Sequence, residues 1–342
     1  MRFYCGLDLS ARTCQVCVID EDMTVKVQKK VRNDWPLILE LISPYKKRLS
    51  CVVESTFNWY WLVDALQEAD FDICLAHTLG LRMITGAKVK TDPRDALKLA
   101  KLLRAGMIPK AYIYPRETRP VRDLVRRRIR VVNMRATDYM TLRRLMYQQG
   151  IIEHSRNSTK QILEEDIQQI FQNKWVQIHA QHELARIRLY TMQIREMERA
   201  IHHTVKETKE YERLLRVSGI GKTLAITIFY EIGEITRFPN AGDFSSYCRV
   251  VPGVAQSGNS VKRGRGSKQG NRYLKWAFSQ AAAYAVRTNE KIRRYYQRQV
   301  RRHRGKGDKL IANNIVAHKL AQAVYHMLRE GTDYREQMLF PN

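Results

Sequence analysis

The order of short apolar segments in the first hundred residues constrains the fold more than any other feature of this chain. Three β-prone segments come first, at residues 2–8, 13–19 and 24–30, with Asp20-Glu21-Asp22 as a turn. The spacing of apolar residues then predicts a helix over 35–45, a strand over 49–53, a helix over 58–69, a strand over 71–75 and a helix over 93–105. Three antiparallel strands followed by alternating helix and strand indicate an α/β domain over residues 1–115.

This order is the one expected of an RNase H-like domain, and four carboxylates stand at the ends of its elements. Asp8 ends the first strand and Glu54 the fourth, while Asp92 and Asp95 lie three residues apart at the start of a helix. Strand ends and a helix start can meet at one edge of a sheet. Two Mg²⁺ ions held by carboxylates stabilise the attacking and leaving oxygens of phosphodiester cleavage. We therefore predict these four residues as catalytic metal ligands for Mg²⁺, with Mn²⁺ as an alternative.

Each of these carboxylates also has an ordinary structural explanation when it is taken alone. Asp92 and Asp95 can cap a helix and complement its dipole. Asp8 can be a turn residue, and Glu54 a solvated strand end. The set of four, in that order and on those elements, favours the metal site.

Positive charge is concentrated after residue 100. The net charge is +26, from 60 Lys and Arg against 34 Asp and Glu. Residues 1–100 hold 14 basic and 13 acidic residues, so the remaining 46 basic and 21 acidic residues lie in 101–342. Such an excess attracts a polyanion and releases its counterions, which makes nucleic acid the leading partner. The chain has no apolar run long enough to cross a bilayer and no recognisable signal peptide, so we expect a cytoplasmic protein without a membrane partner.

The cysteines do not indicate a zinc site. Cys14 and Cys17 form one Cys-x-x-Cys pair, but zinc needs two more ligands at suitable spacing, and no second such pair exists. We expect the six cysteines to serve as small hydrophobic residues in a reducing compartment.

Long helices are predicted at 121–149 and 174–209, within a middle region of residues 116–210. Ile187, Ile194 and Ile201 recur every seven residues. This stripe suits a coiled-coil hairpin or a dimer contact, and it suits equally a plain amphipathic helix on its own domain. The run Arg126-Arg127-Arg128 and the segment Arg293-Arg294-Tyr295-Tyr296 are candidates for phosphate contact and base stacking, or else belong to a solvated helix face.

The last region, residues 211–342, is predicted to be mainly helical. Gly219 and Gly221 form a tight turn between two helical segments over 213–234, followed by Lys222. A Gly-x-Gly turn that opens a helix presents backbone N–H groups to phosphate, as in helix-hairpin-helix units, although a turn without a ligand is the alternative. We also expect helices near 241–249, 272–288 and 310–330.

A basic loop is predicted over residues 257–272. Its stretch 261–272 has five basic residues, three glycines and no acid, so it can follow a phosphate backbone closely. The predicted nucleic-acid contacts are Lys262, Arg263, Arg265, Lys268 and Arg272. Ser257 and Ser260 stand beside the loop, and a serine near phosphate becomes a nucleophile only with an activating partner. Loop serines without a covalent role are the alternative.

Taken together, these motifs resemble the DEDD-type insertion-sequence transposases of the IS110 class, which are related to the Piv and MooV DNA invertases. The resemblance extends over nearly the whole chain in order and approximate spacing. It rests on Gly6-Leu7-Asp8-Leu9-Ser10, Val53-Glu54-Ser55-Thr56, Lys90-Thr91-Asp92-Pro93-Arg94-Asp95-Ala96, Ser218-Gly219-Ile220-Gly221, Pro252-Gly253-Val254 and Ser257-Gly258-Asn259-Ser260.

The resemblance implies more than the residues show by themselves. It implies a RuvC-like domain joined through a coiled coil to a C-terminal transposase domain. Asp8, Glu54, Asp92 and Asp95 match the family's metal-binding tetrad, and Ser257 matches its nucleophile, which becomes covalently linked to DNA. It further implies a dimer or tetramer, donor and target double-stranded DNA, a structured guide RNA, and a bacterial protein that is nucleoid-associated when active.

Other functions remain open at this point. A RuvC-like structure-selective nuclease, or a protein-guided DNA invertase, would use the metal site without the RNA or the covalent serine. A non-enzymatic DNA- or RNA-binding protein would need neither. A sugar-kinase-like ATPase is disfavoured because no second glycine-rich phosphate motif is evident. Ser260 is an alternative nucleophile, and the arginine-rich run 287–306 is assigned to neither DNA nor RNA.

Overall fold

The computed structural model describes residues 1–85, 92–152, 158–205, 208–257, 260–264, 269–303, 305 and 308–340. Within these ranges, residues 85, 92, 93, 158, 253–257 and 260–264 are described by their backbone alone. The chain folds into two compact units, Met1–Arg116 and Glu117–Asn342. The predicted middle and C-terminal regions therefore belong to one unit.

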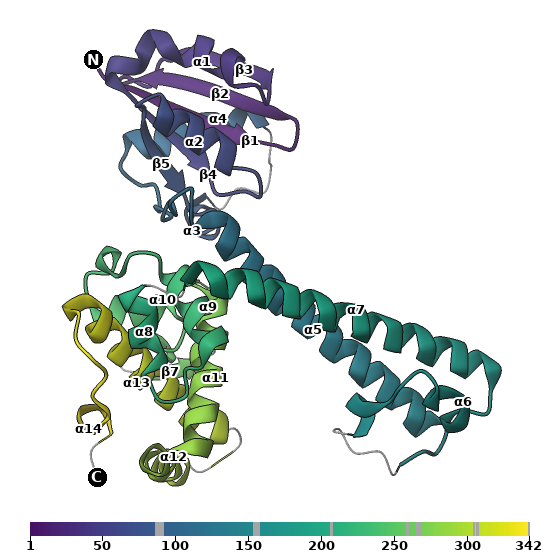
Figure 1. The fold of residues 1–342 in the computed structure, drawn as a ribbon. Helices are drawn as coiled ribbons and strands as arrows, with labels where there is room; N and C mark the ends of the chain where they lie inside the picture. The colour runs from purple at the N-terminus through teal and green to yellow at the C-terminus, as the bar shows by residue number, and fades with distance from the viewer. Residues whose placement is uncertain are drawn as a thin grey trace. The chain divides into compact units, whose positions relative to one another are not determined.

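The first unit is built on a five-stranded mixed sheet (Figure 1). Its strands are β1 (Phe3–Leu9), β2 (Thr13–Asp20), β3 (Val25–Arg32), β4 (Leu49–Glu54) and β5 (Asp72–Ala76), in the order β3-β2-β1-β4-β5. β1, β2 and β3 pair in antiparallel fashion, whereas β4 pairs in parallel with both β1 and β5. The predicted succession of strands along the chain is confirmed, and the DEDD domain is RNase H-like.

Helices cover both faces of this sheet. They are α1 (Trp35–Ile42), α2 (Tyr60–Glu68), α3 (Thr78–Thr85) and α4 (Asp92–Arg104). The predicted helix over 35–45 ends at Ile42, where Ser43–Arg48 forms a 3-10 turn that contains Pro44. α1 and α2 pack against the core around Leu7 and Val53, and α4 packs on the other face. The helix α3 was not predicted.

Two long helices of the second unit, α5 (Arg119–Gln148) and α7 (Lys174–Val205), run side by side (Figure 1). The short elements η2 (Ser158–Gln161) and α6 (Asp166–Ile170) lie between them in sequence. Ile187, Ile194 and Ile201 are buried, and Ile187 shares a core with Leu142 and Met146 of α5. The heptad stripe therefore forms the seam of an intramolecular helical hairpin. The predicted helix over 174–209 ends at Val205.

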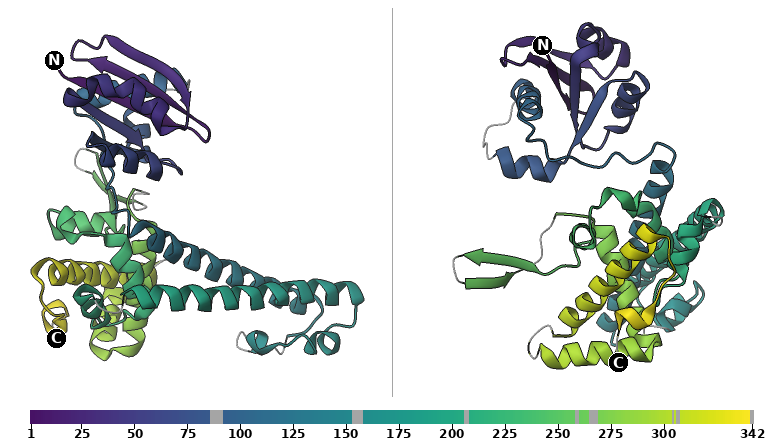
Figure 2. Two further views of the ribbon diagram at one scale, coloured as in Figure 1. Left: turned by 45° about the horizontal axis from the view of Figure 1, so that its top comes forward. Right: turned by 90° about the vertical axis from the view of Figure 1, so that its left-hand side faces the viewer.

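The rest of the second unit is a helical body with one β-hairpin (Figure 2). The helices are α8 (Lys209–Leu215), α9 (Lys222–Ile232), α10 (Ala241–Tyr247), α11 (Arg272–Thr288), α12 (Glu290–Arg302), α13 (Asp308–Glu330) and α14 (Glu336–Leu339), with a 3-10 turn η3 (Ile235–Arg237). They enclose a core that includes Phe244 and Phe278. The hairpin strands are β6 (Gly253–Ser257) and β7 (Ser260–Gly264).

The hairpin corrects the prediction of a loop over 257–272. Five residue pairs join β6 and β7, from Gly253 opposite Gly264 to Ser257 opposite Ser260. The sequence carried the signal, because two residues, Gly-Asn, between two short β-prone segments are typical of a hairpin. Charge and glycine content led to the prediction of a loop instead.

Most of the cysteines lie in the protein interior. Cys5, Cys14, Cys17, Cys51 and Cys248 are buried, and all six cysteines are unbridged. Burial raises the pKa of the Cys17 thiol to about 11, so this thiol stays protonated at neutral pH. Among the described residues, no helix combines the length and apolar character that a membrane span needs.

Candidate active site and nucleic-acid interface

Asp8 and Glu54 lie on neighbouring strands at the same end of the sheet. β1 and β4 are parallel, and their last paired residues are Leu7 and Val53. The next residue on each strand is Asp8 on β1 and Glu54 on β4. The parallel register therefore brings together two carboxylates that are 46 residues apart in the chain.

Both carboxylates belong to the sheet face that α4 covers. Side chains two residues apart on a strand point to the same face, so Asp8 shares the face of Gly6 and Glu54 that of Val52. A Cβ on Gly6 would lie 2.0 Å from the carbonyl oxygen of Ala96 in α4. The absence of a side chain at Gly6 is what allows α4 to lie this close to β1.

The direction of α4 places its first residues at the same edge. Nε of Arg104, at the end of α4, donates to the carbonyl of Glu21, which follows β2 where β1 begins. α4 therefore runs opposite to β1, and its first turn, with Asp92 and Asp95, starts toward the Asp8 end of the strand. The N-terminal end of a helix favours negative charge, since the helix dipole is positive there.

The surroundings of this carboxylate edge fit a cation. Oδ2 of Asp95 is buried, and it has no hydrogen-bond partner among the described residues. The charge of Asp8 adds to burial in raising the pKa of the Cys14 thiol to about 12. Among the described side chains, from which that of Asp92 is missing, no three His, Cys, Asp or Glu residues form a ready metal-binding group.

The predicted serine stands at the tip of the hairpin. Ser257 ends β6, Ser260 begins β7, and the two are cross-strand partners, so both candidate nucleophiles flank the same turn. Lys262 and Arg263 lie in β7, and Arg272 is the exposed first residue of α11. Arg265 and Lys268 lie outside the described residues. The strand pair β6–β7 therefore carries both serines and two of the predicted basic contacts, Lys262 and Arg263.

The two glycines of the Gly-x-Gly turn have different surroundings. Gly219 has φ +85°, and a Cβ there would lie 2.2 Å from the carbonyl oxygen of Ala281 in α11. Close packing against α11 thus accounts for Gly219 without a phosphate. Gly221 caps α9 with open space around it, and Lys222 is exposed beside it. A role of Gly221 and Lys222 in phosphate binding stays a prediction.

A buried ion-pair cluster that was not predicted lies at the start of α11. Glu231 of α9 is fully buried, and its carboxylate accepts hydrogen bonds from Arg122 and Arg126 of α5. The Nδ2 atom of Asn271 donates to the same carboxylate at 2.7 Å. Asn271 also caps α11 through Oδ1, which accepts from the backbone N–H groups of Tyr273 and Leu274. The cluster therefore ties the start of α11, directly after the basic segment, to the long helix α5.

No local sequence pattern predicts this cluster, because Glu231 is more than one hundred residues away in the chain from Arg122 and Arg126. The structure also corrects the prediction for Arg126-Arg127-Arg128. Arg126 pairs with Glu231, and Arg128 pairs with Glu198 of α7. Only Arg127 of the three is exposed, so this run acts mainly inside the protein.

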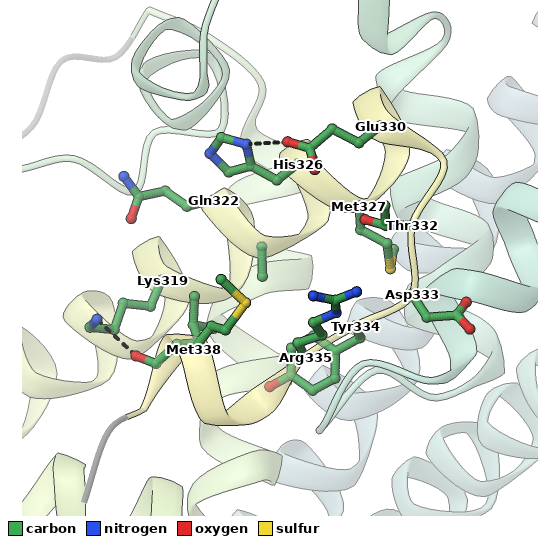
Figure 3. Close-up of a pocket in the computed structure, with 12 residues that line it drawn as sticks. Lys319, Gln322, His326, Met327, Glu330, Thr332, Asp333, Tyr334, Arg335 and Met338 are labelled. Carbon is green, nitrogen blue, oxygen red and sulfur yellow. Dashed lines mark hydrogen bonds and ion pairs between the residues drawn. The ribbon is translucent and has the colours of Figure 1, made fainter.

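A cavity of about 560 Å³ lies between α13 and the C-terminal segment (Figure 3). Nδ1 of His326 lies 3.2 Å from Glu330, and Nζ of Lys319 donates to the carbonyl of Leu339 at 2.9 Å. None of the predicted site residues lines this cavity. The polar groups of the cavity wall bond to one another, and the predicted site residues lie elsewhere. The cavity is therefore not the candidate active site.

Known proteins resemble the chain in both units. A transposase family model for the DEDD domain of IS110 elements matches residues 5–150, and a model described as the transposase IS116/IS110/IS902 family matches residues 211–297. A putative transposase y4qE of Sinorhizobium fredii is 29% identical over 54% of this chain and 45% of its own length. An IS110 insertion-element protein of Streptomyces coelicolor, uncharacterised and of 43.6 kDa, is 30% identical over 36% of this chain and 30% of its own.

A third relative is similar over more of its length. A probable family 20 transposase of Pseudomonas aeruginosa is 25% identical over 82% of this chain and 83% of its own length. The first two relatives are matched over less than half of their lengths. The first family match includes Asp8, Glu54, Asp92 and Asp95, and the second includes Ser257. By these two matches, the chain belongs to the IS110 family of transposases.

Proposed function

We propose that this protein is a transposase that cleaves, exchanges and rejoins DNA strands, with Asp8, Glu54, Asp92 and Asp95 as its metal-binding catalytic residues. One observation carries the proposal. The parallel register of β1 and β4 and the direction of α4 bring the ends of three elements, each with a carboxylate, to one edge of the sheet. That edge is where an RNase H-like domain has its active site.

The carboxylates have a clear chemical task in this proposal. DEDD transposase domains depend on a divalent metal. Mg²⁺, or Mn²⁺ in its place, supplies positive charge next to the attacking and leaving oxygens when bound. The four side chains hold it with hard oxygen ligands, and they would repel one another without a cation. Oδ2 of Asp95 is buried and has no hydrogen-bond partner among the residues that the structure describes. This supports the assignment, because a buried carboxylate oxygen costs free energy unless something binds it.

Ser257 is the proposed nucleophile. Its Oγ forms a bond to a DNA phosphorus while a backbone P–O bond breaks, and the proton lost by the serine balances the proton gained by the leaving deoxyribose oxygen. Rejoining reverses these steps with a hydroxyl from another strand. The position of Ser257 at the tip of a basic hairpin supports this role, because cations beside it can hold a phosphate. Ser260, its cross-strand partner, is the alternative.

Guidance and assembly complete the proposal. The family resemblance implies that a structured RNA pairs with donor and target DNA, so that base pairing selects the sequence and the protein reads backbone and shape. It also implies that the two units act together across subunits in a dimer or tetramer. The net charge of +26 supports contact with several nucleic-acid strands at once.

The deciding experiment measures joining of donor and target DNA with and without the element's flanking non-coding RNA. The proteins compared are the wild type, Asp8→Ala, Asp95→Asn and Ser257→Ala, each with Mg²⁺ or with EDTA. Joining is expected only from the wild type with RNA and Mg²⁺. The losses should exceed about 100-fold, as for other groups that act directly on a reacting centre. On denaturing gels, the wild type should show a covalent protein–DNA adduct, and Ser257→Ala should lack it.

The other outcomes select the other functions. Joining that survives Ser257→Ala but not Asp8→Ala indicates a metal-dependent nuclease or invertase without a covalent bond to Ser257, and Ser260→Ala then tests the neighbouring hydroxyl. Joining without RNA indicates a protein-guided recombinase. Unchanged behaviour of Asp8→Ala would contradict the proposed metal site itself.

A further inference from the structure

The arginine-rich run after residue 287 forms a helix with two distinct sides. α12 (Glu290–Arg302) holds six Lys and Arg residues and a single acid, Glu290. Ile292 is fully buried, and Tyr295 and Tyr296 pack against the core of the helical body. The ring of Tyr295 lies 5.3 Å from that of Phe340. The inner side of α12 is therefore used for packing, and Tyr295 and Tyr296 take part in it. Stacking of these tyrosines on bases stays a prediction.

The outer side carries a regular row of cations. Lys291, Arg294, Arg298 and Arg301 follow one another at intervals of three, four and three residues, which keeps them on one helix face. Together with Gln297 they line an open groove along the helix. The groove is lined only by residues 288–301, so α12 and the two residues before it provide the whole surface.

The acid beside this row holds its partner only weakly. Glu290 pairs with Arg294, but both side chains are more than 70% exposed, at 71% and 74%. An exposed pair of this kind adds little stability, so a phosphate can replace the carboxylate at small cost. Arg293 has a different task, because it donates to the carbonyls of Val286 and Arg287 at the end of α11. Arg293 thus holds α12 to the end of α11, whereas the row of cations on the outer side lines the groove.

We propose that Lys291, Arg294, Arg298 and Arg301 form a binding surface for the phosphate backbone of double-stranded DNA. At 1.5 Å per residue, Lys291 and Arg301 are about 15 Å apart along the helix axis. One DNA strand presents about four phosphates over that length of duplex. A membrane is a poor partner, since the apolar side of α12 is buried in the core and cannot enter lipid.

The surface is expected to bind without regard to base sequence. Arginine and lysine contacts to phosphate position a protein on DNA, whereas base reading needs side chains directed to base edges. DNA is the favoured polyanion because the chain belongs to a transposase family. The inference deepens the proposed function, on which it rests for the choice of DNA, by assigning a DNA surface outside the carboxylate edge and the hairpin. It does not depend on the serine chemistry.

The test compares two double variants of the full chain. Arg294→Gln with Arg298→Gln removes two charges four residues apart on α12. Arg195→Gln with Arg199→Gln removes two exposed charges at the same spacing on α7, where Glu196 and Glu198 stand beside them. Binding to a fluorescent DNA duplex is measured by anisotropy over a series of salt concentrations.

Each phosphate contact contributes about 0.9 to the slope of log affinity against log salt concentration. The slope should therefore fall by about 2 in the α12 double variant and by less than about 1 in the α7 double variant. Arg294→Lys with Arg298→Lys should keep the wild-type slope, because it keeps the charge. The single variant Arg301→Gln should lower the slope by about 1, and it changes too little of the surface to disturb folding.

A wild-type slope in the α12 double variant would overturn the proposal. So would a loss that appears with an RNA duplex of the same sequence and not with DNA, because the surface would then serve RNA. Failure of this inference is separate from failure of the catalytic proposal. Asp8→Ala should lose joining and keep its salt slope, whereas the α12 variant should lose slope and recover joining as the salt concentration is lowered.

Discussion

The carboxylate of Glu231 shows how a single residue can hold distant parts of the second unit together. It accepts hydrogen bonds from Arg122, Arg126 and Asn271, which come from α5 and from the start of α11. Burial raises the pKa of Glu231, but the hydrogen bond from Arg126 and the charges of Arg122 and Arg126 outweigh burial. The net result is a pKa below the ordinary value of 4.5. The folded protein therefore favours the ionised form.

We predict that Glu231→Gln destabilises the second unit by about 3–5 kcal/mol at neutral pH, since it leaves the buried Arg122 and the half-buried Arg126 without their counter-charge. The stabilisation by Glu231 is complete above pH 4.5 and is lost as the pH falls toward its lowered pKa. The difference in free energy of unfolding between the wild type and Glu231→Gln should therefore become smaller in acid. Urea unfolding at pH 7 and near pH 4 measures this change.

Glu198→Gln is the matched control for burial. Glu198 also forms an ion pair with an arginine of α5, Arg128, but its side chain is 34% exposed, whereas that of Glu231 is fully buried. Loss of the Glu198–Arg128 ion pair should lower the free energy of unfolding by no more than about 1 kcal/mol. Equal losses for the two variants, or a Glu231 effect that grows as the pH falls, would contradict the assigned ion pairs.

At the scale of the elements, one glycine sets the contact between the α8–α9 turn and α11. Gly219 combines a φ of +85° with a close approach to the Ala281 carbonyl, while Gly221, two residues on, has φ −90° and open space. A helix-hairpin-helix turn can use its glycines for backbone conformation, for packing or for phosphate. In this structure Gly219 serves the first two purposes.

We predict that Gly219→Ala lowers the free energy of unfolding by at least about 1–3 kcal/mol, because the new Cβ strains the backbone and pushes on α11. Gly221→Ala should cost about 1 kcal/mol or less, as a change at a helix N-cap. Chemical denaturation of both variants provides the comparison. Equal stability of the two proteins would mean that the turn does not pack on α11 as described.

The whole molecule is divided into two units with separate cores. The core around Leu7, Val53 and Leu62 lies within Met1–Arg116, and the core around Phe244 and Phe278 lies within Glu117–Asn342. Charge is divided as well, with 18 basic and 13 acidic residues in 1–116 against 42 and 21 in 117–342. The first unit carries the carboxylate edge, and the second carries most of the excess positive charge.

We predict two separable thermal transitions for the full chain. Leu62→Ala removes a fully buried side chain of the first unit and should lower only one transition, by about 2–5 kcal/mol in stability. Phe278→Ala, fully buried in the second unit, should lower only the other, by about 3–5 kcal/mol. Differential scanning calorimetry resolves the two. One transition that both variants shift together would show that the units unfold cooperatively.

The strands of the first unit and the approach of two of its carboxylates follow from local patterns in the sequence. Short apolar segments mark β1, β2 and β4, and such patterns are local, so they can be recognised without a structure. Asp8 and Glu54 could be predicted to meet because parallel strands end at the same edge of a sheet. The long helices were also predictable, since their heptad stripe of Ile187, Ile194 and Ile201 is a local repeat.

Long-range packing, in contrast, sets which charged side chains form ion pairs inside the protein and which face solvent. Arg126 and Arg298 look alike in the sequence, yet Arg126 neutralises a buried glutamate whose position in the chain is 105 residues away, while Arg298 lines an open groove. Gly219 and Gly221 likewise differ in what packs beside them. Burial and long-range ion pairs depend on contacts between distant segments, and a local sequence pattern contains no information about those contacts.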